Sequence, residues 1–560
     1  MNKKKIIGCI ISVAISLLII FGIYYVQLPA INVYSEDFWG FLMIAMLILV
    51  LPLVIVIRAT NGISVSELFS NIGRSKEYKN KVNVAWGKAG TAAIIIAVGL
   101  PLAVLVLGGL LSSTFFNAKA YADIITVQTG VFNEDMPETD SVTNIALMDS
   151  ASATVLGNRT LGNLSDMVSQ YELSDNYTQI NYQGRPQKVS NLEYADFFRW
   201  INNRERGIPG FVMVDPVNNT AEYKGLSSSM KYVDSAFFGE DLMRKLRFSY
   251  PTKIFGSIYF EIDENGDPYF IVSCMKPTIG LFGAPDVNEV IIFNPCDGSS
   301  EKYSLDETPS WIDIVYTGTL AVEKYDWYGL YSGGYWNSVI GKVDCKQTTD
   351  DYGYITIGDD VWYFTGVTSI SSDESNIGFI ISNARTGEYK FYPVVGAEEY
   401  SAMSAAQGEV QEKGYVASFP SLVNISGEAT YIMVLKDAYG LVKLYALVNV
   451  EQYNIVATGD TQRAAVEAYE KLLRENGVDT SKPELPEDAT ETHSIIVEDV
   501  MIVPVGGEAT AYITAEDGKV YKAVFKNDES LILIRKGDAL SIKCSATEIG
   551  GIYNLLSWSR

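Results

Sequence analysis

Residues 6–28 of the chain read IIGCIISVAISLLIIFGIYYVQL, a run of 23 residues without one charged side chain. A helix needs about 20 consecutive apolar residues to cross the hydrocarbon core of a bilayer. Two similar runs follow, FWGFLMIAMLILVLPLVIVI at residues 38–57 and TAAIIIAVGLPLAVLVLGGLL at residues 91–111. We therefore expect residues 1–115 to form a membrane anchor with three transmembrane helices.

The charges around these runs predict how the anchor is oriented. Lys3 to Lys5 precede the first run, and six Lys or Arg residues lie between the second and third. The turn between the first two runs has no basic residue but contains Glu36 and Asp37. Basic loops stay on the cytoplasmic side. We expect a cytoplasmic N-terminus at the cell membrane and an extracytoplasmic segment at residues 113–560.

The part of the chain after the anchor is strongly acidic. Residues 1–115 carry nine Lys or Arg against four Asp or Glu, which leaves 34 basic and 63 acidic residues, a net charge of −29, in the rest. Such a charge repels nucleic acids and anionic head groups. We expect no nucleic-acid partner; the expected partners are envelope or membrane proteins, with cell-wall glycan as an alternative.

Cysteine is sparse outside the anchor. Cys274, Cys296, Cys345 and Cys544 show no C-x-x-C spacing and are too few for a disulfide framework. A bridge between Cys274 and Cys296 stays open beside the favoured reading of buried free thiols. Sparse cysteine after a basic N-terminus is typical of a bacterial cell-envelope protein.

The remaining residues are too many for one hydrophobic core, so we expect several α+β modules. Each main unit has the pattern of a helix followed by an antiparallel sheet. One such pattern is the helix Ser235–Phe248 before strands Ser257–Asp263 and Pro268–Met275. The expected modules are an outer α+β module (116–230), helix-plus-sheet modules (231–305 and 397–478), an antiparallel β meander (306–396), a linker (479–491) and a small β-barrel (492–560).

Four stretches share an apolar strand that ends in Asp or Asn before a turn. They are FVMVDP (211–216), VIIFNP (290–295), FIISN (379–383) with Thr386-Gly387-Glu388, and Tyr431–Asp437. This pattern resembles the last hairpin of PepSY-type modules, which are extracytoplasmic helix-plus-sheet units. The resemblance covers about half of residues 190–450 and implies a non-catalytic envelope module, of a kind thought in some relatives to bind or restrain peptidases.

The C-terminal residues alternate between apolar and polar side chains, which predicts short strands. Five strands are expected, at Ser494–Pro504, Thr510–Ala515, Lys519–Lys526, Ser530–Arg535 and Ala539–Ser545. Asp517-Gly518 is a typical hairpin turn. Five short strands predict a small closed barrel of the OB or SH3-like kind.

The chain contains a single histidine, His493. Nucleophilic triads need an imidazole base, and zinc sites usually need His or clustered Cys. No Walker loop, G-x-G-x-x-G or H-E-x-x-H motif occurs. We therefore expect a non-catalytic protein without a metal or cofactor.

Two groups of acidic residues leave alternatives open. Asp263, Asn265 and Asp267 alternate as in a calcium loop, but Gly266 favours a hairpin turn instead. A pair among Asp350, Asp351, Asp359 and Asp360 would suffice for a cell-wall-acting carboxylate glycosidase, although solvated turns explain such pairs in an acidic chain.

An aromatic cluster in a Gly-rich stretch is the main candidate for binding. It comprises Tyr325, Trp327, Tyr328, Tyr331, Tyr335 and Trp336. Exposed rings stack on sugars or grip a partner, whereas buried rings fill cores. The expected function is that of a membrane-anchored extracytoplasmic binding or scaffolding protein of the bacterial envelope; a carboxylate glycosidase is the alternative.

Overall fold

The chain divides into two units, residues 1–479 and 480–560, which we treat separately. The computed structural model describes residues 3–59, 76–137, 146–370, 375–478, 490–505, 508–525, 529–545 and 552–560. The predicted linker at 479–491 lies almost entirely outside these residues.

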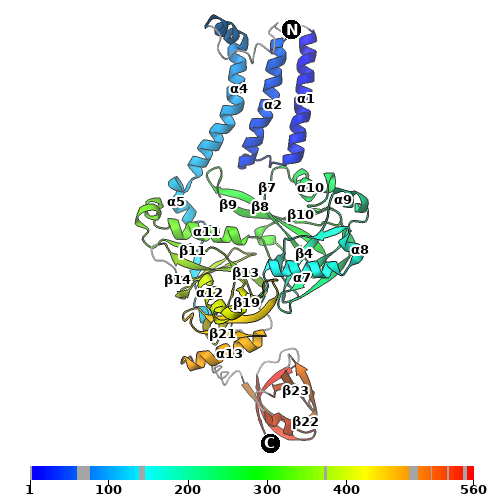
Figure 1. Ribbon diagram of the computed structural model, residues 1–560, viewed down its shortest axis with the longest axis vertical. Helices are drawn as coiled ribbons and strands as arrows, with labels where there is room; N and C mark the ends of the chain where they lie inside the picture. The colour runs from blue at the N-terminus through cyan, green and yellow to red at the C-terminus, as the bar shows by residue number, and fades with distance from the viewer. Residues whose placement is uncertain are drawn as a thin grey trace. The chain divides into compact units, whose positions relative to one another are not determined.

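The first unit begins with three long helices that run side by side, α1 (Lys3–Gln27), α2 (Glu36–Ala59) and α4 (Lys76–Ser112) (Figure 1). Two of them contain stretches long and apolar enough to cross a membrane, Ile7–Gln27 and Ala93–Ser112. The second predicted span, at residues 38–57, falls in α2, which does not add a further such stretch among the residues whose side chains are described. The structure thus supports two of the three predicted spans.

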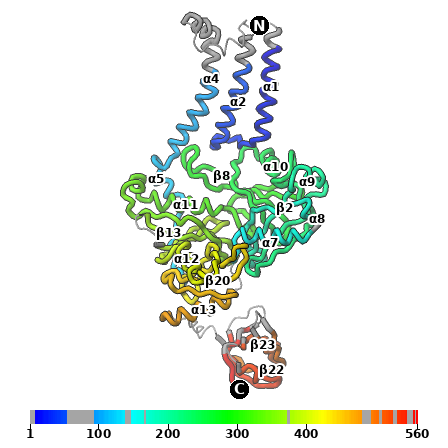
Figure 2. The backbone as a smooth tube through the Cα atoms, in the orientation of Figure 1, coloured from blue at the N-terminus to red at the C-terminus, as the bar shows by residue number. Residues whose placement is uncertain are grey.

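We call residues 113–478 the body. It contains four sheets, which are mostly antiparallel. Figure 2 traces the backbone through them. The first sheet has the order β2-β4-β5-β6, with β3 paired to β4. Helix α7 (Ser150–Gly162) packs on it through Ala153 and Leu161. Its strands are β2 (Tyr171–Leu173), β3 (Thr178–Tyr182), β4 (Arg185–Tyr194), β5 (Ile208–Asp215) and β6 (Thr220–Met230).

The second sheet has the order β10-β9-β8-β7 and shares a core with the first. The rings of Phe211 in β5 and Phe260 in β7 lie 5.7 Å apart within this core. The strands are β7 (Ile254–Ile262), β8 (Pro268–Ile279), β9 (Gly283–Phe293) and β10 (Ser300–Ser304).

The third sheet follows the order β1-β15-β14-β13-β11, with β12 on β13 and β16 on β14. The segment expected as a meander also contains a helix, α11 (Gly318–Tyr331). Leu320 of α11 packs on the second sheet, whereas Ala321 and Tyr325 pack on the third. The strands are β1 (Val127–Thr129), β11 (Lys346–Thr348), β12 (Gly353–Ile357), β13 (Asp360–Ser369), β14 (Ser375–Asn383), β15 (Tyr389–Tyr392) and β16 (Gly396–Ala397).

The fourth sheet is covered by helices on both faces. Tyr431 and Met433 of β19 face α12 (Glu399–Glu409), and the alternate residues Ile432 and Val434 face α13 (Gln462–Glu475). Successive side chains of a strand point to opposite faces, so this strand is apolar throughout. The strands are β17 (Val416–Ala417), β18 (Ser421–Ile425), β19 (Glu428–Lys436), β20 (Val442–Asn449) and β21 (Val456–Gly459).

The helix predicted at Ser235–Phe248 is shorter than expected. The 3₁₀ turn η2 (Phe238–Glu240) comes first, and α10 covers only Leu242–Ser249. Phe238 has a positive φ of 54°, which an α-helix does not accommodate. The Asp241 carboxylate then accepts a hydrogen bond from the Arg244 N–H at 2.7 Å and caps the new helix.

All four PepSY-like stretches lie at hairpins, and an Asp or Asn organises each turn. The side chains of Asp215, Asn294, Asn383 and Asp437 each accept one or two hydrogen bonds from backbone N–H groups two to four residues ahead, at 2.8–3.0 Å. Asp263 does the same for Asn265 and Asp267, at 2.9 Å each. The sequence Asp263–Asp267 is thus the hairpin turn that was preferred over a calcium loop.

Shorter helical elements connect the sheets. They are α5 (Thr114–Ala122), α6 (Phe132–Asp135), α8 (Ser165–Val168), α9 (Phe197–Asn203), η3 (Leu305–Glu307), η4 (Asn337–Gly341) and η5 (Gln411–Lys413). The five cysteines, all among the described residues, are free thiols, so Cys274 and Cys296 form no bridge.

The second unit is a closed five-stranded barrel with the order β22-β23-β24-β26-β25. Strands β24 and β26 are parallel, and the other pairs are antiparallel. The prediction of a strand at Ser530–Arg535 is wrong. This segment contains the 3₁₀ helix η7 (Glu529–Leu533), and Leu531 and the following Ile534 are buried at i, i+3 spacing. The strands are β22 (Thr490–Val505), β23 (Glu508–Ala515), β24 (Val520–Val524), β25 (Ala539–Ser545) and β26 (Ile552–Ser559).

Candidate functional site

The aromatic cluster predicted from the sequence is divided among three places. Tyr325 is 1% exposed and packs with Tyr328 in the core beneath the third sheet. Trp327 and Tyr331 pack against Tyr121 of α5, with ring centroids 5.1 and 6.4 Å from it. These four rings support the fold and do not share a cleft.

Tyr335 and Trp336 lie in the loop after α11, away from the other four. Their rings lie 5.0 and 5.9 Å from the ring of Phe115, which follows directly on α4. Trp336 is 64% exposed, and Tyr335 is half-buried. The part of the cluster that is available for contacts is therefore adjacent to the end of the anchor.

The four predicted carboxylates have different surroundings. Asp350 is exposed, and Asp351 accepts the N–H of Tyr352 at 2.8 Å in a turn. The Asp360 carboxylate accepts a hydrogen bond from Arg385 Nε at 2.9 Å, and the two side chains form an ion pair. Only Asp359 lines a described cavity, where its carboxylate accepts Asn181 Nδ2 at 2.7 Å.

This cavity has a volume of about 370 Å³ and lies where the first three sheets meet. We call it the carboxyl cleft. The β3–β4 hairpin, the end of β7, the segment before α11 and the β12–β13 turn supply its walls. Its lining includes Asn181, Tyr182, Trp311, Asp313 and Asp359.

A second carboxyl group, Asp313, faces the carboxyl cleft next to a buried glutamate. Its Oδ2 accepts the backbone N–H of Asn181 at 2.9 Å, so Asn181 contacts both Asp313 and Asp359. Burial, with a further contribution from nearby Asp359 and Asp360, raises the pKa of Asp313 to about 8. Behind it, Glu261 is 0% exposed, and burial with the Asp313 charge raises the pKa of Glu261 well above its usual value.

The carboxyl cleft therefore combines a carboxyl group that stays protonated at neutral pH with a second carboxyl group in a more exposed setting. A proton donor and an acceptor of this kind are the minimum set for general acid–base chemistry. Among the described residues, no three His, Cys, Asp or Glu side chains are grouped so that they could hold a metal ion. Asp313 was missed in the sequence because Glu261 and Asn181, which define its setting, lie far from it along the chain.

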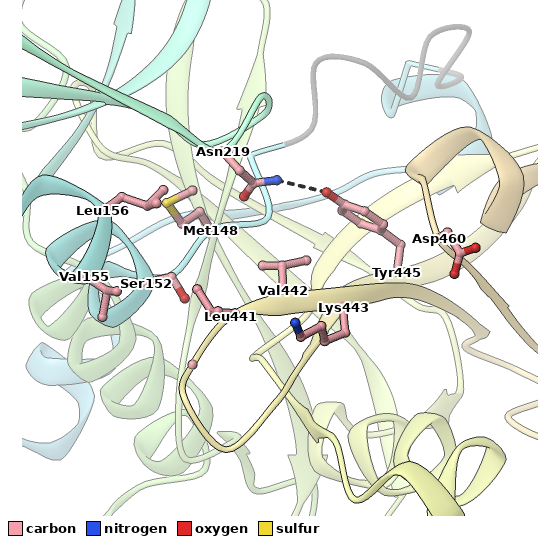
Figure 3. Close-up of a pocket in the computed structure, with 11 residues that line it drawn as sticks. Met148, Ser152, Val155, Leu156, Asn219, Leu441, Val442, Lys443, Tyr445 and Asp460 are labelled. Carbon is pink, nitrogen blue, oxygen red and sulfur yellow. Dashed lines mark hydrogen bonds between the residues drawn. The ribbon is translucent and has the colours of Figure 1, made fainter. Parts of the chain in front are cut away.

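A second cavity, of about 320 Å³, lies between α7 and the edge of β20 (Figure 3). We call it the hairpin pocket. Asn219 Nδ2, in the β5–β6 turn, donates to Tyr445 Oη at 2.9 Å across it. Met148 and Leu156 line one side of it, Asp460 lies at the other, and Val442 and Lys443 lie between them. The residues that line the pocket come from segments more than 200 positions apart in the sequence, so no local motif indicates the pocket.

Two joints connect the membrane helices to the body. At the first, Arg247 Nε donates to Leu28 O at 2.9 Å, and Arg244 Nε donates to Tyr25 O at 3.3 Å. The backbone N–H of Ile31 also donates to Pro251 O at 2.7 Å. The end of α1 is thus bonded directly to α10 and the residues that follow it.

The second joint lies at the end of α4. Ser112 Oγ accepts the backbone N–H groups of Leu281 and Phe282 at 2.8 and 3.1 Å. Gly108 packs so closely on this β8–β9 hairpin that a Cβ atom there would lie 2.6 Å from the Phe282 ring. The Ser112 carbonyl accepts Tyr121 Oη at 2.8 Å, which also fixes α5.

No protein-family model matches the chain, and no curated protein matches it. The resemblance to PepSY-type modules therefore stays a prediction from the sequence.

Proposed function

We propose that this chain is a membrane-anchored extracytoplasmic binding or scaffolding protein of the bacterial envelope and that it is not an enzyme. The observation that carries the proposal is the pair of joints at Arg247 and Ser112, which bond the ends of α1 and α4 to the body. A catalytic domain on a tether needs no such fixed placement. A protein that must present a surface at a set height above the membrane does.

The proposed topology has three spans, with α2 as the second, a cytoplasmic N-terminus and the body outside. The charge pattern supports it, since Lys3 to Lys5 precede the first apolar run and six Lys or Arg residues lie between the second and third apolar runs. In the C-terminal barrel, the order of the strands is 1-2-3-5-4 with the third and fifth parallel. That order, with a helical segment between the third and fourth strands, supports an OB-type assignment.

The hairpin pocket is the proposed contact point for an envelope protein. Its mixed lining of apolar side chains with Lys443 and Asp460 resembles a surface that accepts a peptide segment. A photo-crosslinking amino acid at Val155, which lines the pocket and is 41% exposed, tests this in native cells. The same amino acid at exposed Tyr453, outside the pocket lining, is the matched control.

The proposal expects a reproducible cross-link to one envelope or membrane protein from position 155 and none to that protein from position 453. The cross-link should decrease when Ser112→Ala and Arg247→Met weaken the joints. Identical adduct patterns from both positions would reject the pocket as the contact point.

A carboxylate hydrolase acting on cell-wall glycan is the second candidate, and one observation favours it. Asp313 and Asp359 both contact Asn181 in the carboxyl cleft, which Trp311 also lines. Retaining and inverting glycosidases use two carboxyl groups that flank the scissile bond. Purified full-length protein would then release soluble fragments from peptidoglycan, Asp313→Asn and Asp359→Asn would abolish the release, and exposed Asp350→Asn would not. The scaffold proposal expects no release by any of the four proteins.

A further inference from the structure

A group of apolar side chains is exposed where α4 passes into the body. Phe115 and Phe116 at the start of α5 are two of them, and the others come from the loop after α11. We call the whole group the apolar lip, and it comprises Phe115, Phe116, Trp336, Val339, Ile340 and Val343. Ile340 is 75% exposed and Val343 is 66% exposed. Contiguous exposed apolar surface of this kind marks a contact with a membrane or a protein.

The depth of the apolar lip follows from the chain itself. The apolar stretch of α4 is Ala93–Ser112, 20 residues, which spans about 30 Å as a helix. Asn117 of α5 donates to the carbonyl of Leu111 at 2.7 Å, so the first turn of α5 lies beside the last turn of this stretch. If α4 crosses the bilayer, Phe115 and Phe116 therefore lie at its boundary.

The loop after α11 is held at the same level. The rings of Tyr335 and Trp336 contact Phe115 edge to face, at interplanar angles of 76° and 78°. Helix α11 also packs along α5, as Figure 1 shows. The start of the loop, at Tyr335 and Trp336, is consequently at the level of Phe115.

The loop is ordered before it meets any partner. Asn337 Nδ2 donates to Val343 O at 2.8 Å, and Asn337 Oδ1 accepts the Val343 N–H at 3.2 Å. Lys342 adopts a left-handed conformation, φ 51°, and its N–H donates to Asn337 O at 2.6 Å. These bonds close the π-turn η4 and leave Val339, Ile340 and Val343 directed to the surface, so little further entropy is lost on contact.

The charges beside the apolar lip fit a lipid surface. Lys119, one turn after Phe115 and Phe116, is exposed, and so is Lys342 in the loop. Lysine stems lie along apolar surface while the ammonium group reaches the phosphate layer, and aromatic rings concentrate at the same level. Asp344 is the acidic neighbour of Lys342 and is also exposed.

We propose that the apolar lip inserts into the head-group and acyl boundary of the leaflet on the side of the body. The occupant is phospholipid, because the lip is continuous with the end of the α4 stretch. This lipid contact adds to a protein contact at α10. There the ring centroid of Phe248 lies 5.8 and 6.1 Å from those of Tyr24 and Tyr25, near the end of α1. The inference rests on the proposed membrane anchor and extends it, because the body then contacts the lipid directly at the apolar lip.

The test uses the full chain in vesicles of palmitoyl-oleoyl phosphatidylethanolamine and phosphatidylglycerol. An environment-sensitive NBD fluorophore is attached to Ile340→Cys, or to Tyr439→Cys as the control, in a chain with Cys9→Ala and Cys296→Ser. Tyr439 is 84% exposed at the β19–β20 turn. The three remaining cysteines are buried, and the parent chain without an added cysteine measures their background labelling.

The expected result is a blue-shifted emission for the label at position 340, which loses most of its intensity to lipid nitroxides near the head group and little to aqueous iodide. The label at 439 should behave in the opposite way. Equal iodide quenching at both positions, without nitroxide quenching, would overturn the inference. Shielding from iodide without nitroxide quenching would also overturn it, because a second copy of the chain would then cover the lip.

Flotation of the vesicles separates this result from the fate of the anchor. If the protein floats with the vesicles while the label at position 340 is exposed to water, the proposed anchor is supported and the proposed contact of the apolar lip with lipid is rejected. If the protein does not float, the anchor itself fails. The variant Ile340→Glu, whose side chain lies on the surface, should fold normally and lose the contact in the same assay.

Discussion

The carboxylate of Glu261 accepts the backbone N–H of Asp313 at 2.9 Å and that of Ile314 at 3.0 Å, which brings two carboxyl groups together inside the body. Glu261 is fully buried, and Asp313 is 6% exposed. Two negative charges cannot be held here without great cost. Burial therefore raises the pKa of both carboxyl groups above their usual values, next to the carboxyl cleft.

Asp313 should make the stability of the body depend on pH. Burial raises its pKa to about 8 from an ordinary value near 4, so the folded state binds the proton more tightly than the unfolded state. The free energy of unfolding should then fall as pH rises from about 4 to about 8, by a few kcal/mol in total. Asp313→Asn should flatten this slope and raise the melting temperature at pH 8 more than at pH 5, measured by circular dichroism in detergent. Parallel pH profiles for the variant and the parent would contradict the assignment, and Asp350→Asn is the control.

Arg247 should be required for the joint between α1 and the body. It is 4% exposed and donates to the carbonyls of Leu28 at 2.9 Å and Lys253 at 2.5 Å. Arg247→Met keeps much of the packing but leaves these partly buried carbonyls without this donor, at a cost of roughly 2–4 kcal/mol. Limited proteolysis should then cleave between α1 and α2 faster than in the parent. Exposed Arg206→Met provides the comparison, and equal cleavage rates in both variants would show that the joint is not maintained by Arg247.

Trp327 and Trp336 should differ although they are nine residues apart. Trp327 packs edge to face on Tyr121, at 5.1 Å between centroids, so Trp327→Ala should destabilise the body by roughly 2–4 kcal/mol. Trp336 is exposed, so Trp336→Ala should change the stability by no more than about 0.5 kcal/mol. Chemical denaturation followed by tyrosine and tryptophan fluorescence checks both variants. A large loss of stability in Trp336→Ala would mean that its contact with Phe115 supports the fold.

The five cysteines should all react as free thiols in the unfolded chain. Cys274 is buried in β8, and Cys296 Sγ donates to Ser228 O at 3.1 Å, so neither is committed to a bridge. Burial raises the pKa of Cys274 to about 11, which slows its reaction in the folded chain. Alkylation in denaturant without reductant, followed by mass spectrometry, should add five groups. Three groups would indicate one disulfide.

The local elements were predictable where the signal lies within a few residues. The apolar runs gave α1 and α4, and the Asp or Asn at the end of each apolar strand gave the hairpin turns at Asp215, Asn294 and Asp437. The predicted start of α10 was wrong because Phe238 takes a positive φ. The strand predicted at 530–535 was wrong because the i, i+3 spacing of the buried Leu531 and Ile534 was taken for strand alternation.

The candidate sites were predictable only in part. Asp359 and Trp336 were named from composition, and the structure gives each a defined setting. Asp313 was not named, since a single aspartate before a helix carries no signal. Its raised pKa comes from burial and from nearby Asp359 and Asp360, and these arise only when the second and third sheets pack.

The sequence by itself determined the properties that depend on neighbouring residues: the apolar stretches, the charge asymmetry across residue 115, the hairpin turns and the presence of one histidine. Only the tertiary structure decided which faces met. It buried Tyr325 and exposed Trp336, paired Glu261 with Asp313, and bonded Arg247 to the end of α1. The physical reason is range: turn geometry and helix periodicity act over a few residues, whereas burial, pKa shifts and joints depend on contacts between residues tens to hundreds of positions apart.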